Sequence, residues 1–493
     1  MFQSPLELKR RQWNGRLILL LLTIVGMTAL HSHARAADIR WDLWGVPHIW
    51  AESDEDAAHA FGWAQMRANA DEVLRLYARA RGQAAQFFGP GADRMEIKSD
   101  TWVLMMGVPE LAETWWLAQT PSEKAIIEAF TAGMNEFAAS SDASIDGAAR
   151  KLLPIRPQDV LAHLANTLLY GFVVDPWRVE YDSTAWTAGR LKTNKAERDG
   201  FHQETPFGSN AWAISPKNSV SGNAMLMINP HLPWSGETRW FEVELASDAF
   251  ALHGVALVGL PFIAIGFNRH LGWSHTVNPM HGYYLYELNT EEDGYAWDGG
   301  TRPFVTRKRV IQVRQPDGSE TAVEVTFRDS VHGPVVARQD GRALALWVVG
   351  RDAPHLIGQY WRMAKSKTFE EFLSALKMQQ MPMFSLTYAD RDGHIFFDFG
   401  GRHPAEGPID QRSQTLLPGT SAKTLWRGIL PFDHLPQVLD PPNGWVQNAN
   451  DPPWTATFPS VLKPEDFPSG LTTEDTTNLR AQQLIRALDR DHH

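Results

Sequence analysis

The sequence contains no cysteine. This absence excludes disulfide bonds, thiolate metal sites and a cysteine nucleophile. Positive charge is also in deficit, because 46 Lys and Arg stand against 57 Asp and Glu, for a formal net charge of −11. An acidic balance argues against nucleic acid as a partner. The chain of 493 residues shows no internal repeat or low-complexity tract and is long enough for one large domain or two or three ordinary ones.

Long hydrophobic runs are scarce, and the one at residues 17–30 belongs to a targeting segment. A basic stretch with Arg10 and Arg11 precedes it, and the small residues Ala34 and Ala36 follow it. This order predicts an export signal over residues 1–36 and a periplasmic or secreted protein. A bilayer-spanning helix needs about 20 apolar residues, so we expect no stable membrane insertion. An uncleaved membrane anchor is the alternative.

Helical patterns dominate residues 37–190, although 39–50 predicts two short strands around Gly45. Residues 54–81 carry small and aromatic apolar residues at helical spacing, and Gly82 follows as a C-cap. Thr120 opens a capping box with Pro at the first helical position, which predicts a helix to about residue 139. A further helix is expected at 158–170. Residues 191–208 are polar and charged, which is typical of a linker.

Strand patterns dominate from residue 209 onward. Residues 240–245, 251–258, 262–267 and 274–277 predict a meander. More strands are expected at 309–313, 322–327, 343–349, 385–390 and 394–399. A second capping box, at Thr368, predicts a helix to about residue 378. The fold class is therefore α+β.

The chain is organised around residues 206–234. Gly208 and Ser209 lead into an apolar strand at 210–214, and a turn-rich connection at 215–223 joins it to a second strand at 224–228. On its own, a serine behind a glycine at the start of a buried strand is most often structural.

Ten short motifs, in order along the chain, resemble the penicillin acylase family of N-terminal-nucleophile (Ntn) hydrolases, closest to the cephalosporin (glutaryl-7-aminocephalosporanic acid) acylases. They are WGVPHI at 44–49, GWAQ at 62–65, LRLYARARG at 74–82, GSNAWA at 208–213, NPHL at 229–232, TVN at 276–278, SVHGPV at 330–335, YADRDG at 388–393, VQNANDPPWT at 446–455 and LRAQQ at 479–483. Together they are specific for the family and not for a substrate.

The resemblance implies a four-layer αββα Ntn-hydrolase sandwich with a mainly helical α-subunit at 37–190 and a spacer or linker at 191–208. The β-subunit would begin at Ser209 and run to residue 493. The bond after Gly208 would be cut autocatalytically, and the α and β fragments would stay associated. Because family members continue well past the helix around 479–488, the resemblance also implies that the C-terminal part of the β-subunit is missing.

Carried over position by position, the resemblance makes Ser209 the nucleophile and its freed α-amine the general base. An α-amine has a pKa of about 7.7–8, so much of it is neutral near pH 7. The backbone N–H of Val277 and the side-chain amide of Asn450 would form the oxyanion hole, since acyl transfer needs donors aimed at the developing charge. Arg480 would hold Asn450. His231 would orient Ser209 or assist maturation.

Each of these positions also has a plainer interpretation. Asn450 precedes Asp451 and two prolines, where Asn is a common turn residue. His231 could be a strand-end histidine bonded to backbone, and Arg480 an arginine on a helix surface. The histidines show no metal-binding spacing, and the segment after Val277 lacks the acidic residues of calcium-binding relatives, so we expect neither a metal nor a cofactor.

The acyl pocket implied by the resemblance is more apolar than that of the cephalosporin acylases. Ala264 stands where those relatives have an Arg that binds the acyl carboxylate, Leu257 stands where they have a Gln that supports this Arg, and Trp240 replaces a Tyr. Leu232 and Phe384 would complete the pocket. A buried carboxylate without a partner costs several kcal/mol, roughly, so these changes favour an uncharged acyl chain.

Two functional hypotheses remain open from the sequence. The first is an exported amidohydrolase that deacylates a small N-acyl amide, such as an acyl-homoserine lactone, a fatty-acyl amide or a β-lactam side chain. The second is a catalytically inactive, truncated remnant or ligand-binding protein of the same family.

Overall fold

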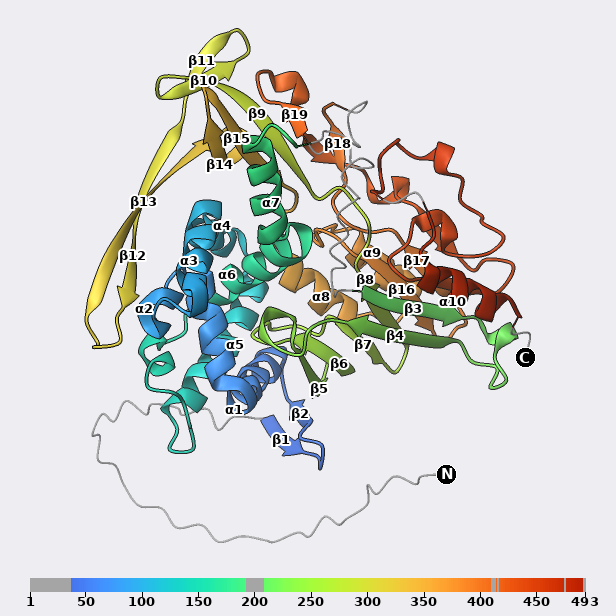
Figure 1. Ribbon diagram of the computed structural model, residues 1–493. Coiled ribbons are helices and arrows are strands. Elements are labelled where there is room, and N and C mark those ends of the chain that lie inside the picture. The colour runs from blue at the N-terminus through green and yellow to red at the C-terminus, as the bar shows by residue number, and fades with distance from the viewer. Residues whose placement is uncertain (1–36, 192–207, 409–413, 415, 474–475, 491–493) are drawn as a thin grey trace, which may run out of the picture. The chain divides into compact units, whose positions relative to one another are not determined.

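The computed structural model describes residues 37–191, 208–408, 414, 416–473 and 476–490. The predicted signal segment and residues 192–207 of the predicted linker lie outside the described residues. Most helices lie in the first half of the chain and most strands in the second, as the colours of Figure 1 show, and the mixed α and β class expected from the sequence is confirmed.

The first half contains helices α1 to α7 behind a short β-hairpin. The hairpin strands are β1 (Ala37–Trp41) and β2 (Pro47–Ala51), as predicted. The helices are α1 (Asp54–Ala80), α2 (Ala84–Phe88), α3 (Met95–Met106), α4 (Val108–Ala118), α5 (Pro121–Ala139), α6 (Pro157–Thr167) and α7 (Pro176–Thr187). The capping box at Thr120 is present. A π-helical turn, Leu168–Val173, continues α6 over the predicted end of that helix.

Helices α1 and α5 approach closely because each carries a glycine at the crossing. A Cβ atom on Gly62 would stand 2.1 Å from the carbonyl oxygen of Phe130, and one on Gly133 would stand 1.9 Å from that of His59. Such distances are far inside van der Waals contact, so any side chain at either position would force the helices apart. Most of the apolar face expected for residues 54–81 is buried, but Ala68 is exposed next to the non-helical backbone of Asn69.

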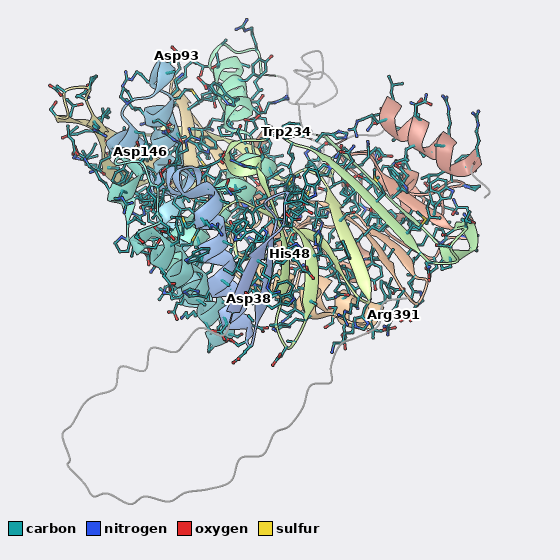
Figure 2. The ribbon with its side chains drawn as sticks, turned by 90° about the horizontal axis from the view of Figure 1, so that it is seen from below. Asp38, His48, Asp93, Asp146, Trp234 and Arg391 are labelled. Carbon is teal, nitrogen blue, oxygen red and sulfur yellow. The ribbon has the colours of Figure 1, made fainter. Side chains whose placement is uncertain are left out.

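The hairpin of the first half forms one edge of a nine-stranded sheet whose other strands come from the second half. The strand order is β1-β2-β5-β6-β7-β8-β16-β17-β21. Strand β2 runs parallel to β5 (Trp240–Ala246), with His48 opposite Glu244. His48, labelled in Figure 2, contacts the Glu244 carboxylate through Nδ1 at 2.5 Å.

The predicted meander is confirmed as four consecutive antiparallel neighbours in this sheet. After β5 come β6 (Ala251–Leu257), β7 (Ile265–Asn268) and β8 (Leu271–Thr276). The sheet continues through β16 (Ser385–Asp390), β17 (Ile395–Asp398) and β21 (Gln437–Leu439). Helices α8 (Leu356–Lys365) and α9 (Phe369–Leu376) bring aromatic rings against it, such as Phe372 near Trp273.

A second, three-stranded sheet packs against β8, β16 and β17 and carries Ser209. Its order is β22-β3-β4, from β3 (Gly208–Ile214), β4 (Met225–His231) and β22 (Trp445–Asn448). The hairpin β3–β4 matches the one predicted around the connection 215–223. Alternate residues of β3 are buried, which fits a strand with one face toward the larger sheet.

A third sheet of eight strands was only partly predicted. It consists of β9 (Tyr283–Glu291), β10 (Gly294–Trp297), β11 (Gly300–Pro303), β12 (Val305–Arg314), β13 (Glu320–Ser330), β14 (Gly333–Gln339), β15 (Arg342–Val348) and β19 (Leu416–Pro418). The long β12–β13 hairpin contacts α2, and Figure 1 draws it in yellow beside the blue helices. Strands β9, β10, β11, β14 and β19 were missed.

The last helix, α10 (Leu479–Arg490), contacts β22. Asn478 caps it, because its Oδ1 accepts the backbone N–H of Ala481 at 2.9 Å. None of the helices in the described part of the chain combines the length and hydropathy required to cross a bilayer.

Candidate active site

Ser209 is the second residue of β3 and is 3% exposed. Its Oγ donates to the carbonyl oxygen of the preceding residue, Gly208, at 2.6 Å. Its backbone N–H donates to Asn450 Oδ1 at 2.7 Å. The hydroxyl therefore lies beside the peptide bond that joins Gly208 to Ser209.

Gly208 lies in a space that suits a residue without a side chain. A Cβ atom there would stand 3.1 Å from both Arg480 Nη2 and His231 Nδ1, closer than side-chain carbons normally come. Strand pairing explains one of these neighbours, because Gly208 is directly opposite His231 in the β3–β4 ladder. The Gly-Ser junction is thus flanked by an imidazole and a guanidinium.

Asn450 follows β22 by two residues and has a left-handed backbone with φ +66°. Asn tolerates this conformation better than most residues, yet it costs energy unless neighbours hold it. The backbone N–H of Asn450 donates to Asn448 Oδ1 at 3.0 Å. Its side-chain Nδ2 donates to the carbonyl oxygen of Val277 at 2.7 Å.

Asp451, which is buried, and Asn478, which is half-buried, hold the loop 449–451. Asp451 Oδ1 accepts the N–H of Ala449 at 2.6 Å, and Asn478 Nδ2 donates to the carbonyl oxygen of Ala449 at 2.8 Å. Burial raises the pKa of Asp451. Since Asn478 also caps α10, one residue fixes both the loop and the helix that carries Arg480.

Arg480 connects the start of β3 to the Asn450 side chain. Its Nη1 donates to the carbonyl oxygen of Ser209 and to Asn210 Oδ1, both at 2.7 Å, and its Nη2 donates to Asn450 Oδ1 at 2.8 Å. Asn450 Oδ1 therefore accepts two hydrogen bonds, which fixes the orientation of its amide and turns Nδ2 toward Val277. Partial burial lowers the pKa of Arg480, which still stays cationic at neutral pH.

His231 ends β4 and is half-buried. Partial burial and, second, the nearby charge of Arg480 lower its pKa below the ordinary value of 6.5. The imidazole is therefore neutral near pH 7 and has a free electron pair on one ring nitrogen. Such a group beside Gly208 can accept a proton.

The structure thus brings together all five residues that were predicted to be catalytic, along with Gly208. The oxyanion hole remains a prediction, because in the uncleaved chain Asn450 Nδ2 donates to the Val277 carbonyl. An amide nitrogen carries two hydrogens, so a second donor remains.

Of the predicted pocket residues, Leu257 and Ala264 are buried, and Leu232, Trp240 and Phe384 are half-buried. Trp240 and Leu257 are direct cross-strand partners in β5 and β6. Ala264 is buried, and its carbonyl oxygen accepts Trp273 Nε1 at 2.8 Å. Phe384 has φ +100°, and its ring packs edge-on against Phe172.

Leu232 follows β4 and is half-buried. Two residues beyond it, Trp234, labelled in Figure 2, is 94% exposed.

Two grooves lie elsewhere on the protein. One, of about 640 Å³, runs between β4 and the β7–β8 hairpin, and its lining includes Leu226 and Phe267. The other, of about 720 Å³, lies between α4 and the third sheet, with Arg351 and Trp426 among its lining. Neither is lined by Ser209. Within the described segments, no three His, Asp or Glu side chains gather as a metal site would require.

A comparison with protein families decides the family of this chain. The model of the family described as penicillin amidase matches residues 36–493. The chain belongs to the penicillin amidase family.

Curated relatives of this penicillin amidase family chain include acyl-homoserine lactone acylases named PvdQ. That of Pseudomonas savastanoi pv. phaseolicola is 27% identical over 525 residues, covering 95% of this chain and 65% of the relative. That of Pseudomonas putida is 27% identical over 478 residues, covering 88% and 61%. Aculeacin-A acylase of Actinoplanes utahensis is 25% identical over 509 residues, covering 90% and 63%. The chain therefore spans under two-thirds of the length of these relatives.

Among solved structures, the thermostable penicillin G acylase from Alcaligenes faecalis matches with a TM-score of 0.48 and 23% identity, over 57% of this chain and 49% of that one.

Sequence reasoning missed several residues that hold the site of this penicillin amidase family member, Asp451 and Asn478 among them. Asn210 Oδ1 accepts a hydrogen bond from Arg480, and Asn448 Oδ1 accepts one from the backbone N–H of Asn450. Thr276 donates through Oγ1 to Asn448 Oδ1 at 2.5 Å. A signal was available for two of them, because Asn448 and Asn450 form an Asn-x-Asn pair at the end of one strand and Thr276 directly precedes Val277.

Proposed function

We propose that this chain is a self-processing amidohydrolase that removes the acyl group from N-acyl compounds through an N-terminal serine. The observation that carries the proposal is the position of Ser209 Oγ, 2.6 Å from the carbonyl oxygen of Gly208, with the Ser209 N–H held by Asn450. A hydroxyl beside that carbonyl is suited to attack it, with His231 as the nearby proton acceptor.

Maturation would proceed by an N→O acyl shift. Ser209 Oγ attacks the carbonyl carbon of Gly208 and its proton passes to a base, and collapse of the tetrahedral intermediate breaks the C–N bond. Gly208 is then joined to Ser209 through an ester, and the Ser209 nitrogen, after gaining a proton, is a free amine. Water hydrolyses the ester, which leaves a carboxylate on Gly208 and a free hydroxyl on Ser209.

Turnover would use the same groups with the α-amine as base. The amine takes the Ser209 Oγ proton while Oγ attacks the acyl carbon of the substrate. The Val277 N–H and Asn450 Nδ2 stabilise the developing oxyanion. The amine of the substrate leaves with the proton, an acyl ester remains on Ser209, and water releases the acid.

The fragments would remain together after cleavage because the sheets are shared. Strand β2 of the predicted α-subunit (37–190) pairs with β5 of the predicted β-subunit (209–493), and α1 packs on the same sheet. Two packed sheets with helices on their outer sides are the basis for inferring the four-layer αββα sandwich.

The substrate we propose is a small amide with an uncharged acyl chain. The relatives named acyl-homoserine lactone acylase and aculeacin-A acylase support N-acyl compounds as the class. The apolar character of Trp240, Leu257 and Ala264 supports an aliphatic or aromatic acyl group over a carboxylate-bearing one. Export through residues 1–36 would place the enzyme in the periplasm or outside the cell, where it would degrade acylated signals or antibiotics.

The test is hydrolysis of N-acyl-homoserine lactones with acyl chains of increasing length. Hydrolysis is measured by the amount of primary amine that is released. We expect turnover that depends on chain length and is lost in Ser209→Ala. Turnover that survives in Ser209→Ala would place the nucleophile elsewhere. If no N-acyl-homoserine lactone and no other N-acyl amide is hydrolysed by cleaved protein, the proposed activity is wrong.

A further inference from the structure

The two donors of the proposed oxyanion hole come from different sheets. Val277 directly follows β8 of the nine-stranded sheet, and Asn450 follows β22 of the three-stranded sheet by two residues. Their separation is therefore not fixed by strand pairing. It depends on how the two sheets are held against each other at this end.

Two side-chain hydrogen bonds cross between the sheets here. In one, Asn450 Nδ2 donates to the Val277 carbonyl at 2.7 Å. That bond is made by the same amide group that would donate to the oxyanion. It therefore cannot fix the position of that amide independently. In the other, Thr276 Oγ1 donates to Asn448 Oδ1 at 2.5 Å, and it involves neither proposed donor.

The Thr276–Asn448 bond is well protected from water and reaches both donors through adjacent backbone. Thr276 is 2% exposed and Asn448 is 0% exposed. Thr276 is covalently joined to Val277. Asn448 Oδ1 also accepts the backbone N–H of Asn450, and Asn448 Nδ2 donates to the carbonyl oxygen of Asp451 at 3.1 Å. Asn448 thus holds the left-handed backbone of Asn450, and Thr276 in turn holds the side chain of Asn448.

We propose that Thr276 and Asn448 are positioning residues that set the distance between the two oxyanion donors. They act through Val277 and Asn450 and do not touch the substrate. This inference rests on the proposed function. A small displacement between donors weakens transition-state stabilisation far more than ground-state binding, so the expected loss is in kcat with little change in KM.

The chain offers a matched control in the neighbouring strand. Thr387 lies in β16, on the same face of the sheet as Thr276, because Ser385 is the direct partner of Thr276 and residues two apart share a face. Thr387 is 1% exposed, and its Oγ1 has no hydrogen-bond partner among the described residues. Thr387→Val therefore also removes one buried threonine hydroxyl, but it leaves the hydrogen bond between Thr276 and Asn448 in place.

The experiment compares Thr276→Val, Thr276→Ser and Thr387→Val with the unmutated chain. Three quantities are measured: the fraction cleaved after Gly208, the kcat and KM of cleaved protein for the N-acyl-homoserine lactone hydrolysed fastest, and the unfolding temperature. We expect Thr276→Val to lose about 10- to 100-fold in kcat at nearly unchanged KM. Thr276→Ser should recover most of that loss, and Thr387→Val should retain full kcat.

Each outcome decides the inference. Slow or absent cleavage in Thr276→Val, with normal cleavage in Thr387→Val, supports it, because Asn450, which Asn448 holds in place, also accepts the N–H of Ser209. Equal kcat and equal cleavage in the two valine variants overturns it. If Thr276→Val does not fold, Thr276→Ala and Thr276→Ser are compared in its place, and equal kcat in those two overturns it. If the unmutated chain neither cleaves nor turns over, the proposed function fails and this inference fails with it.

Discussion

Asn450 Oδ1 accepts the backbone N–H of Ser209 at 2.7 Å, while Arg480 donates to the same oxygen at 2.8 Å. One amide oxygen is thereby fixed from two sides, and the amide nitrogen points toward Val277. After cleavage, the same oxygen would accept from the Ser209 α-amine and keep its electron pair directed at Oγ.

The first prediction concerns Asn450. Asn450→Ala removes the proposed oxyanion donor and the acceptor for the Ser209 N–H, and we expect kcat to fall by about 10²–10³. Only cleaved protein should be assayed, since cleavage itself is also expected to slow. A kcat equal to that of the unmutated enzyme would exclude Asn450 from the oxyanion hole.

The second prediction concerns Arg480. Lysine keeps the charge but cannot reproduce the three hydrogen bonds of the guanidinium, so Arg480→Lys should lower kcat by about tenfold or more. Arg486, exposed on the same helix, provides the control, and Arg486→Lys should leave kcat unchanged. Equal kcat in the two variants would make Arg480 an ordinary helix-surface arginine.

The third prediction is a pH dependence of maturation. Because burial and Arg480 lower the pKa of His231, its neutral form persists to lower pH than that of an ordinary histidine. If His231 accepts the Ser209 proton, the cleavage rate should be flat near pH 7 and fall only below about pH 6.5. His231→Gln should lose this acid limb and cleave slowly at every pH. An unchanged profile in His231→Gln would assign the proton to another base.

The fourth prediction concerns the acyl pocket. Each buried CH₂ contributes about 0.8 kcal/mol, so a few added methylenes should raise kcat/KM by about tens-fold while the pocket accepts them. Glutaryl amides should be poor substrates, and Ala264→Arg should shift preference toward them. A clear preference of the unmutated enzyme for glutaryl would place a carboxylate partner elsewhere and contradict the assignment of Trp240, Leu257 and Ala264 to the pocket.

Local patterns predicted much of the fold. The hairpin around Ser209, the meander from β5 to β8 and the helix opened by Thr120 each depend on alternation, periodicity or caps within a short window, and each is present. The third sheet was largely missed. Its strand β9 pairs with β15 and β19, which are distant in sequence, so no local pattern specifies that pairing.

In the candidate site, too, sequence motifs predicted some residues, while contacts between residues distant in sequence were missed. The motifs located Ser209, Asn450 and Arg480, which the structure brings within hydrogen-bond distance of one another. The bond from Thr276 to Asn448 joins residues 172 positions apart on different sheets, and no sequence spacing could predict it.

The central claim is that Ser209 becomes a new N-terminus by its own chemistry, and the intact masses of purified protein test it most directly. The unmutated chain should give two fragments, the second beginning at Ser209, and Ser209→Ala should give one uncut chain because no hydroxyl remains to attack Gly208. Ser209→Cys should still cleave, since a thiol performs the same shift. Two fragments with the same boundary in Ser209→Ala, or an uncut unmutated chain, would contradict the account.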